Sequence, residues 1–117
     1  MNNLENIKNV YFLGIGGIGM SALARYFKFT GRNVAGYDRT QTALTNALTN
    51  EGIPVHYEDD IRNIPTNWNP LETMAVFTPA LPDENQELTW FRSKPIGLMK
   101  RAKVLGLVCN ERKGIAV

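Results

Sequence analysis

The sequence predicts a three-layer α/β/α domain built on a mostly parallel sheet of about five strands. Strand-like and helix-like segments alternate along the chain, with no internal repeat and no low-complexity linker. The strand-like segments are short and continuously apolar, as is typical of parallel strands covered on both faces. A glycine-rich turn joins the first strand to the first helix. At 117 residues, the chain is one domain and an incomplete Rossmann-like unit, because a full dinucleotide fold usually needs a second half of similar size.

The first half of the chain supports this alternation element by element. Residues 10–13 form an apolar run that predicts the first strand. One helical face follows, with apolar residues at positions i, i+3, i+4 and i+7, namely Met20, Leu23, Ala24 and Phe27. We expect a second strand, a second helix and a weak third strand over residues 33–37, 42–51 and 54–57, with Gly31 and Gly52 ending the two helices.

The second half is less regular. Residues 58–73 are polar and broken by prolines, so we expect a loop or a short helix there. The next elements are predicted as a strand, a helix and a fifth strand, over residues 74–77, 84–91 and 95–98. A further helical face is expected from Leu98, Ala102, Leu105 and Cys109. Residues 114–117 have the character of another strand, which predicts a domain boundary after residue 113.

Composition and charge narrow the class of protein. With 44% hydrophobic and 21% charged residues, the chain is typical of a soluble globular protein. Its net charge of +2 and its lack of a basic run with interleaved aromatics argue against nucleic acid as a partner. We expect a cytoplasmic protein without membrane contact, because residues 1–9 lack an apolar signal core and no stretch of about 18 apolar residues follows. The only cysteine, Cys109, excludes an internal disulfide, and we expect it to be buried rather than nucleophilic.

Residues 14–19 carry the strongest functional signal. Gly14, Gly16 and Gly19 satisfy G-x-G-x-x-G between a strand and a helix, the context in which this pattern binds a phosphate. Gly14 can adopt backbone angles that a β-carbon forbids, Gly16 and Gly17 expose bare N–H groups, and Gly19 lets the helix lie close to the strand. We therefore predict a diphosphate site with contacts from Gly14, Ile15, Gly16, Gly17, Ile18, Gly19, Met20 and Ser21.

The glycine pattern does not say which diphosphate binds. Asp38 ends the second apolar run, where a dinucleotide-binding domain places the acid that bonds a ribose. Arg39 stands next to it and can instead serve a phosphate. Asp38 can also cap the following helix, which leaves its role open. The segment Thr78-Pro79-Ala80 ends a strand at the carboxyl edge of the sheet, where open α/β sheets bind their ligands.

Other polar residues give weaker signals. His56 is the only histidine, and its place in a weak strand favours a structural role over a catalytic one. We expect Lys100, Arg101 and Lys103 to form a solvated helix face rather than a phosphate site. The sequence contains no G-x-x-x-x-G-K-[ST], no metal-ligand spacing and no general-base arrangement, so we predict no catalytic residue and no metal ligand.

Four segments carry a more specific pattern than the glycines alone. They read F-L-G-I-G-G-I-G-M-S-A-L-A over residues 12–24, G-Y-D over 36–38, V-F-T-P-A over 76–80 and K-R-A-K-V-L over 100–105. Together they resemble the Mur ligase family of peptidoglycan synthesis, in the branch that adds L-alanine to UDP-N-acetylmuramate. The chain departs from that pattern in three places. Tyr37 replaces a small residue, Lys103 replaces an acid, and Glu58 and Asp59 stand where many members carry a histidine.

The resemblance implies a UDP-sugar-binding N-terminal domain over residues 1–113. It implies that the glycine turn holds the diphosphate of UDP-N-acetylmuramate and that the uridine lies against Asp38, Thr78, Pro79 and Ala80. ATP and Mg²⁺ are implied for the full-length ligase only, because residues 114–117 resemble the strand that leads into the family's P-loop. By similarity, the ligase phosphorylates the lactyl carboxylate, and L-alanine attacks the acyl phosphate. The 117-residue chain alone is therefore expected to be inactive.

Two other functions stay open at this point. The glycines and Asp38 alone support the cofactor domain of an NAD(P)-dependent oxidoreductase. A regulatory α/β module that senses a nucleotide requires only the phosphate-binding turn. Gly17, the Met20-Ser21 pair and the segment 100–105 favour the ligase domain over both.

Overall fold

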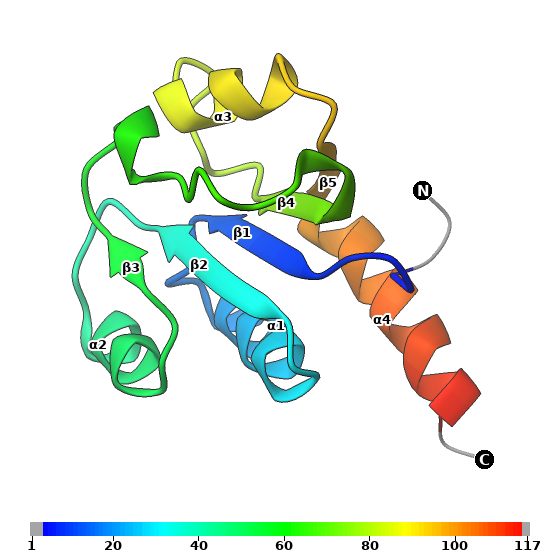
Figure 1. Ribbon diagram of the computed structural model, residues 1–117. Coiled ribbons are helices and arrows are strands. Elements are labelled where there is room, and N and C mark those ends of the chain that lie inside the picture. The colour runs from blue at the N-terminus through cyan, green and yellow to red at the C-terminus, as the bar shows by residue number, and fades with distance from the viewer. Residues whose placement is uncertain (1–3, 116–117) are drawn as a thin grey trace.

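The computed structural model describes residues 4–115, and the side chains of residues 4–110. One sheet of five strands lies at its centre, in the order β3-β2-β1-β4-β5, and all neighbouring strands are parallel (Figure 1). The strands are β1 (Asn9–Leu13), β2 (Asn33–Tyr37), β3 (Val55–His56), β4 (Thr73–Phe77) and β5 (Gly97–Lys100). The predicted α/β class and parallel sheet are confirmed.

Helices cover both faces of the sheet. Figure 1 shows helices both below and above the sheet. The lower layer holds α1 (Ile18–Phe29), α2 (Ala43–Asn50) and α4 (Arg101–Ile115), and the upper layer holds α3 (Gln86–Arg92). Two short 3₁₀ helices, η1 (Ile61–Asn63) and η2 (Pro70–Glu72), lie in the polar segment for which a loop or short helix was predicted.

The core is divided by the sheet into two clusters that share β1. Every residue of β1 is buried, because the strand lies between β2 and β4. Phe12 packs on the side of α1, α2 and α4, where it meets Phe27. Tyr11 packs on the side of α3, where it meets Phe91. The alternation of side chains along one strand therefore supplies both layers.

The chain order creates a switch point beside β1. The chain moves outward from β1 through β2 to β3 and then returns to β4 on the other side of β1. Leu13 is in register with both Tyr37 and Phe77, so the loops after these three strands leave the sheet at one edge. In open α/β sheets, the crevice at such a point is where ligands bind.

The predicted face of the last helix was wrong. Leu98 lies in β5, and Leu105 and Cys109 are exposed. The helix begins only at Arg101, and its buried side chains are Val104, Leu107 and Val108, at positions i, i+3 and i+4. The prediction counted helical spacing from Leu98, which belongs to a strand. The predicted buried positions of the helix therefore lie about one residue away from the observed ones.

Two further boundaries differ from the prediction. Strand β5 lies at Gly97–Lys100, two residues later than expected. Gly114 and Ile115 belong to α4 and not to a new strand, while residues 116–117 lie outside the described part of the chain. No helix within the described residues is long and apolar enough to cross a membrane.

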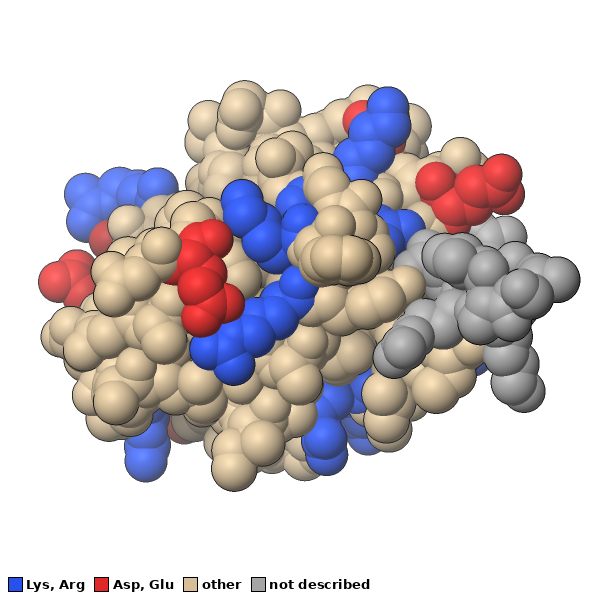
Figure 2. Space-filling model, turned by 90° about the horizontal axis from the view of Figure 1, so that it is seen from below, with Lys and Arg blue, Asp and Glu red and all other residues tan. Residues whose placement is uncertain are grey.

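The lower face carries charges of both signs. Figure 2 shows Lys and Arg side chains in separate groups on this face, with Asp or Glu beside several of them. One ion pair joins α1 to α2, since Arg25 donates to both carboxylate oxygens of Glu51 at 2.8 Å. These hydrogen bonds lower the pKa of the Glu51 carboxyl and raise that of Arg25.

Candidate functional site

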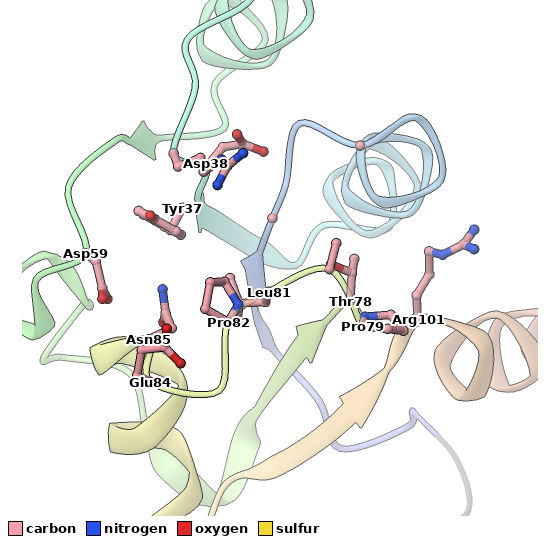
Figure 3. Close-up of a pocket in the computed structure, with 14 residues that line it drawn as sticks. Tyr37, Asp38, Asp59, Thr78, Pro79, Leu81, Pro82, Glu84, Asn85 and Arg101 are labelled. Atoms are coloured by element: carbon pink, nitrogen blue, oxygen red, sulfur yellow. The ribbon is translucent and has the colours of Figure 1, made fainter.

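An open cleft of about 770 Å³ lies at the carboxyl edge of the sheet, over the switch point (Figure 3). The segments that follow β1, β2 and β4 form it, together with the segment before α3 and the first residue of α4. Its lining residues are Gly14, Gly17, Tyr37, Asp38, Arg39, Asp59, Thr78, Pro79, Ala80, Leu81, Pro82, Glu84, Asn85 and Arg101. Six of the predicted site residues therefore meet in one cavity: Gly14, Gly17, Asp38, Thr78, Pro79 and Ala80.

The glycine turn is held by the backbone. Gly14 has φ of 94°, in the left-handed region that favours glycine, as predicted. The N–H groups of Gly14 and Ile15 donate to the carbonyl of Tyr37, at 2.8 and 3.0 Å, which binds the turn to the end of β2. A methyl group on Gly14 would contact Thr78 Oγ1 at 3.5 Å, so the turn also touches the segment after β4.

The N-terminus of helix α1 lies at the cleft. Gly17 is its N-cap and offers no side chain to the first N–H groups. The first intrahelical bond runs from the Ser21 N–H to the Gly17 carbonyl, at 2.8 Å. The N–H groups of Ile18, Gly19 and Met20 precede it and have no acceptor within the helix. These three donors and the positive end of the helix dipole can hold an anion.

Asp38 stabilises the glycine turn and does not cap helix α2. Its Oδ2 accepts from the Gly16 N–H at 2.8 Å, and its Oδ1 accepts from the Thr40 N–H at 3.0 Å. Helix α2 is capped by Thr42, whose side chain accepts from the Thr45 N–H, so the capping role considered for Asp38 is wrong. The Gly16 N–H, predicted to face a ligand, is already occupied. Each carboxylate oxygen keeps a second lone pair, and Asp38 still borders the cleft.

Arg101 lies against the start of α1. A methyl group on Gly19 would overlap the Arg101 guanidinium, so this glycine makes room for the side chain and not, as predicted, for a strand. Residues 4–110 supply no carboxylate partner to Arg101. A cation beside the positive end of a helix is electrostatically unfavourable until an anion joins them. The sequence predicted a solvated helix face for Arg101, and the side chain is exposed, but it also lines the cleft.

The side chains of the other residues predicted to contact the diphosphate do not line the cleft. The side chains of Ile15 and Met20 are buried in the core, and only their backbone remains available. Ser21 is buried as well, and its Oγ donates to the Ile18 carbonyl at 2.9 Å. Ile18 is 86% exposed, outside the lining of the cleft.

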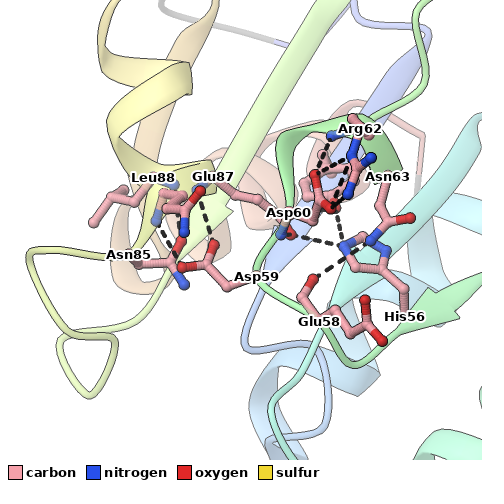
Figure 4. A network of polar contacts seen from close by, with 11 residues as sticks. His56, Glu58, Asp59, Asp60, Arg62, Asn63, Asn85, Glu87 and Leu88 are labelled. Atoms are coloured by element: carbon pink, nitrogen blue, oxygen red, sulfur yellow. Dashed lines mark hydrogen bonds and ion pairs between the residues drawn. The ribbon is translucent and has the colours of Figure 1, made fainter.

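A buried polar network supports the opposite end of the cleft (Figure 4). Glu87 is fully buried, and its Oε1 accepts from the Tyr11 hydroxyl at 2.5 Å. Its Oε2 lies 2.8 Å from His56 Nε2 and accepts from the Asp60 N–H at 3.2 Å. Since the Tyr11 proton is directed at Glu87, His56 carries its proton on Nε2. Burial, and next the Glu87 carboxylate, raise the pKa of Tyr11 far above its usual value.

This network assigns His56 a structural position, in agreement with the sequence. It joins β1, β3 and α3 beneath the cleft wall. Arg62 binds the neighbouring Asp60 carboxylate at 2.6 Å and lowers its pKa to about 2. No group of three His, Cys, Asp or Glu residues among those the structure describes is arranged to hold a metal ion.

The lining residues absent from the predicted site include Asp59, Glu84, Asn85 and Arg101. Asn85 lies in a segment that carried no motif, and Asp59 was noted only as a departure from the family's histidine. Arg101 did carry a signal, because it belongs to one of the four segments that resemble the Mur ligases. The general preference for solvated lysines and arginines outweighed that signal.

The fold and the position of the cleft are typical of α/β domains that bind nucleotides at the switch point of the sheet, and the start of the first helix offers donors to an anion. A comparison with protein families matches residues 9–113 to the Mur ligase family, catalytic domain. The chain belongs to the Mur ligase family.

Individual relatives agree with this assignment. The chain is 49% identical to UDP-N-acetylmuramate–L-alanine ligase of Flavobacterium johnsoniae, over 98% of this chain and 26% of that protein. It is 48% identical to the enzyme of the same name from Porphyromonas gingivalis, over 95% of this chain and 25% of that protein. The crystal structure of UDP-N-acetylmuramate–alanine ligase from Thermotoga maritima matches with a TM-score of 0.80 and 30% identity, over 90% of this chain and 23% of that one. The chain thus spans about a quarter of the length of these relatives.

Proposed function

We propose that this chain is the N-terminal domain of a UDP-N-acetylmuramate–L-alanine ligase and that its cleft binds the UDP part of the sugar nucleotide. The observation that carries the proposal is Arg101, whose guanidinium lies against Gly19 at the start of α1. The guanidinium and the free N–H groups of the first helical turn converge on one place. A diphosphate supplies the charge and the acceptor oxygens that these donors lack.

The assignment of the ligand follows from the cleft and the relatives together. A volume of about 770 Å³ is in the range of cavities that hold drug-sized ligands. The relatives named above act on a UDP-sugar, while the glycine turn and Asp38 alone supported an oxidoreductase. We place the uridine toward Asp38 and the segment Thr78-Pro79-Ala80, and the diphosphate on the backbone of residues 17–20 with Arg101.

The chemistry of the whole ligase requires more than this domain. Forming an acyl phosphate needs a positioned γ-phosphate and its metal ion, and the cleft described here is used by UDP. We propose that ATP, Mg²⁺ and L-alanine bind in parts of the protein outside these 117 residues, and that the protein works in the cytoplasm. The lactyl carboxylate would take the γ-phosphoryl group of ATP, and the amine of L-alanine would displace that phosphate to form the amide.

Titration calorimetry tests the ligand assignment. The 117-residue chain should bind UDP and UDP-N-acetylmuramate more tightly than NAD or NADP. Tighter binding of either dinucleotide would contradict the proposal. ATP-dependent phosphate release by this chain, with substrate and L-alanine present, would contradict the proposal that ATP binds outside these 117 residues.

A pair of glycine variants tests the anion site. Gly17 has φ of −67°, and a β-carbon there meets no atom closer than 3.7 Å, so Gly17→Leu should fold. Its side chain would block the approach of a phosphate to the start of α1 and remove UDP binding. Gly106→Leu introduces the same side chain into open space on α4 and should leave binding unchanged. Unchanged binding by folded Gly17→Leu would place the anion elsewhere.

A further inference from the structure

The two ends of the cleft differ in charge. Arg101 stands at the end near α1, while Asp59 and Glu84 line the opposite end, as Figure 3 shows. Carboxylates at that opposite end repel the diphosphate and the lactyl carboxylate of a UDP-sugar. The neutral end of the ligand, its base, is therefore the part that fits beside Asp59.

Asn85 brings an unused donor to the acidic end. The residue is 5% exposed, and its Oδ1 accepts from the Leu88 N–H at 2.9 Å, which caps α3. Its Nδ2 donates to no residue of the described part. Figure 3 shows this amide nitrogen turned into the space between Asp59 and Pro82. This amide nitrogen faces the open cleft and is free to donate to a ligand carbonyl.

Asp59 brings an acceptor to the same place. Its Oδ2 accepts from the Gln86 N–H at 2.8 Å and its Oδ1 from the Glu87 N–H at 3.0 Å, so its position is fixed by the start of α3. Each oxygen keeps a second lone pair for a ligand. Donor and acceptor thus stand side by side in the cleft wall, both held by α3.

We propose that Asp59 and Asn85 form the base-reading pair of the cleft and that they recognise the edge of uracil. The Asp59 carboxylate accepts from the uracil N3–H, and the Asn85 amide donates to the carbonyl next to it. This inference rests on the proposed binding of UDP. Tyr37, Leu81 and Pro82 line the same end and supply apolar surface for a flat ring.

The Glu87 network positions this pair. Glu87 follows Asn85 on α3 and bonds the Asp60 N–H at 3.2 Å, beside Asp59. Its bonds to Tyr11 and His56 fix α3 to the sheet. Both members of the base-reading pair are thus set before a ligand enters, which reduces the entropy lost on binding.

A specificity measurement tests the pair. The wild-type chain should bind UDP at least tenfold more tightly than CDP, because cytosine has no proton on N3. In Asp59→Asn, the carboxamide oxygen can keep one of the two bonds to α3, while the NH₂ gives up the other and can donate to N3 of cytosine. The ratio of the two dissociation constants should then shift toward CDP by roughly tenfold, the value of one hydrogen bond to a charged group. Asp83→Asn makes the same change at an exposed residue outside the lining and should leave the ratio unchanged.

A measurement on the wild-type chain needs no substitution. UDP should shift the side-chain amide resonances of Asn85, whereas a ribose diphosphate without a base should not. Equal dissociation constants of UDP and CDP for the wild type would overturn the base-reading pair. Equal Asn85 shifts with UDP and with the ribose diphosphate would overturn it as well. Neither result would contradict the proposed UDP site. Absence of any UDP binding would overturn both.

Discussion

The two ends of the cleft are built by different means. The anion end uses the backbone N–H groups of consecutive residues, 18–20, and one side chain from elsewhere, Arg101. The opposite end collects side chains from separate segments, among them Tyr37, Asp59 and Asn85. An anion needs only N–H groups and charge, which a helix start supplies. Reading a base edge requires a donor and an acceptor at a set spacing, which only tertiary packing supplies.

The largest effect is expected from breaking the support of the base end. Glu87→Leu removes the buried carboxylate that accepts from the Tyr11 hydroxyl, the His56 Nε2–H and the Asp60 N–H, and leaves only the 2.8 Å contact between Tyr11 and His56. We expect the free energy of unfolding to fall by about 3 kcal/mol. Urea denaturation measures it, with exposed Glu84→Gln as a control that should change little. An equal stability of Glu87→Leu and wild type would show that the network does not hold α3.

The anion end should respond in affinity and not in stability. Arg101→Ala removes the cationic side chain that lies against Gly19 at the start of α1. We expect UDP to bind at least tenfold more weakly, as for other charge-assisted phosphate contacts. The thermal midpoint should stay close to that of the wild type, because Arg101 is exposed.

Lys103→Ala is the matched control for Arg101→Ala. Lys103 lies on the same helix and is exposed, but it does not line the cleft. Its removal should leave the affinity for UDP nearly unchanged. If both variants lost affinity equally, general attraction between charges would explain the effect, and Arg101 would have no specific role.

Asp38 links the two ends, and its removal should have an intermediate effect. Asp38→Ala leaves the Gly16 and Thr40 N–H groups without their acceptor. We expect a loss of about 1 kcal/mol in unfolding free energy and several-fold weaker UDP binding, because the glycine turn is less firmly held. Calorimetry and urea denaturation on one sample measure both. Wild-type stability combined with weak binding would instead indicate direct contact with the ribose.

The sequence predicted the glycine turn well because its determinants are local. The glycine spacing places a turn, a strand before it and a helix after it, and Gly14 has the φ that the pattern requires. The alternation of short apolar runs predicted the parallel sheet for a similar reason. The order of the strands in the sheet determines which loops lie next to one another at its carboxyl edge. The sequence patterns predicted the strands but not their order.

The base end was missed for a physical reason. Asp59 and Asn85 are 26 positions apart, and their side chains meet only because α3 docks beside the segment after β3. The buried Glu87 was also unforeseen, because glutamate in a helical segment is usually exposed and its partners lie 76 and 31 positions away. The error in α4 came from a single boundary, since one wrong starting residue rotates a whole helical face.

The smallest effect concerns pH and the same Glu87 network. Burial and the Glu87 carboxylate raise the pKa of Tyr11, while the unfolded chain titrates near pH 10. A raised pKa means that the hydroxyl stabilises the fold fully below about pH 10 and loses this contribution as the pH rises above that value. Tyr11→Phe lacks the titrating group and the hydrogen bond, so it should be less stable than wild type at neutral pH.

The stability gap between the two proteins, measured by urea denaturation from neutral pH to about pH 11, should narrow only above pH 10. Tyr37 and the lysines titrate in both proteins and cancel in the difference. A gap that stays constant across this range would show that Tyr11 remains as easy to ionise in the folded chain as in the unfolded one.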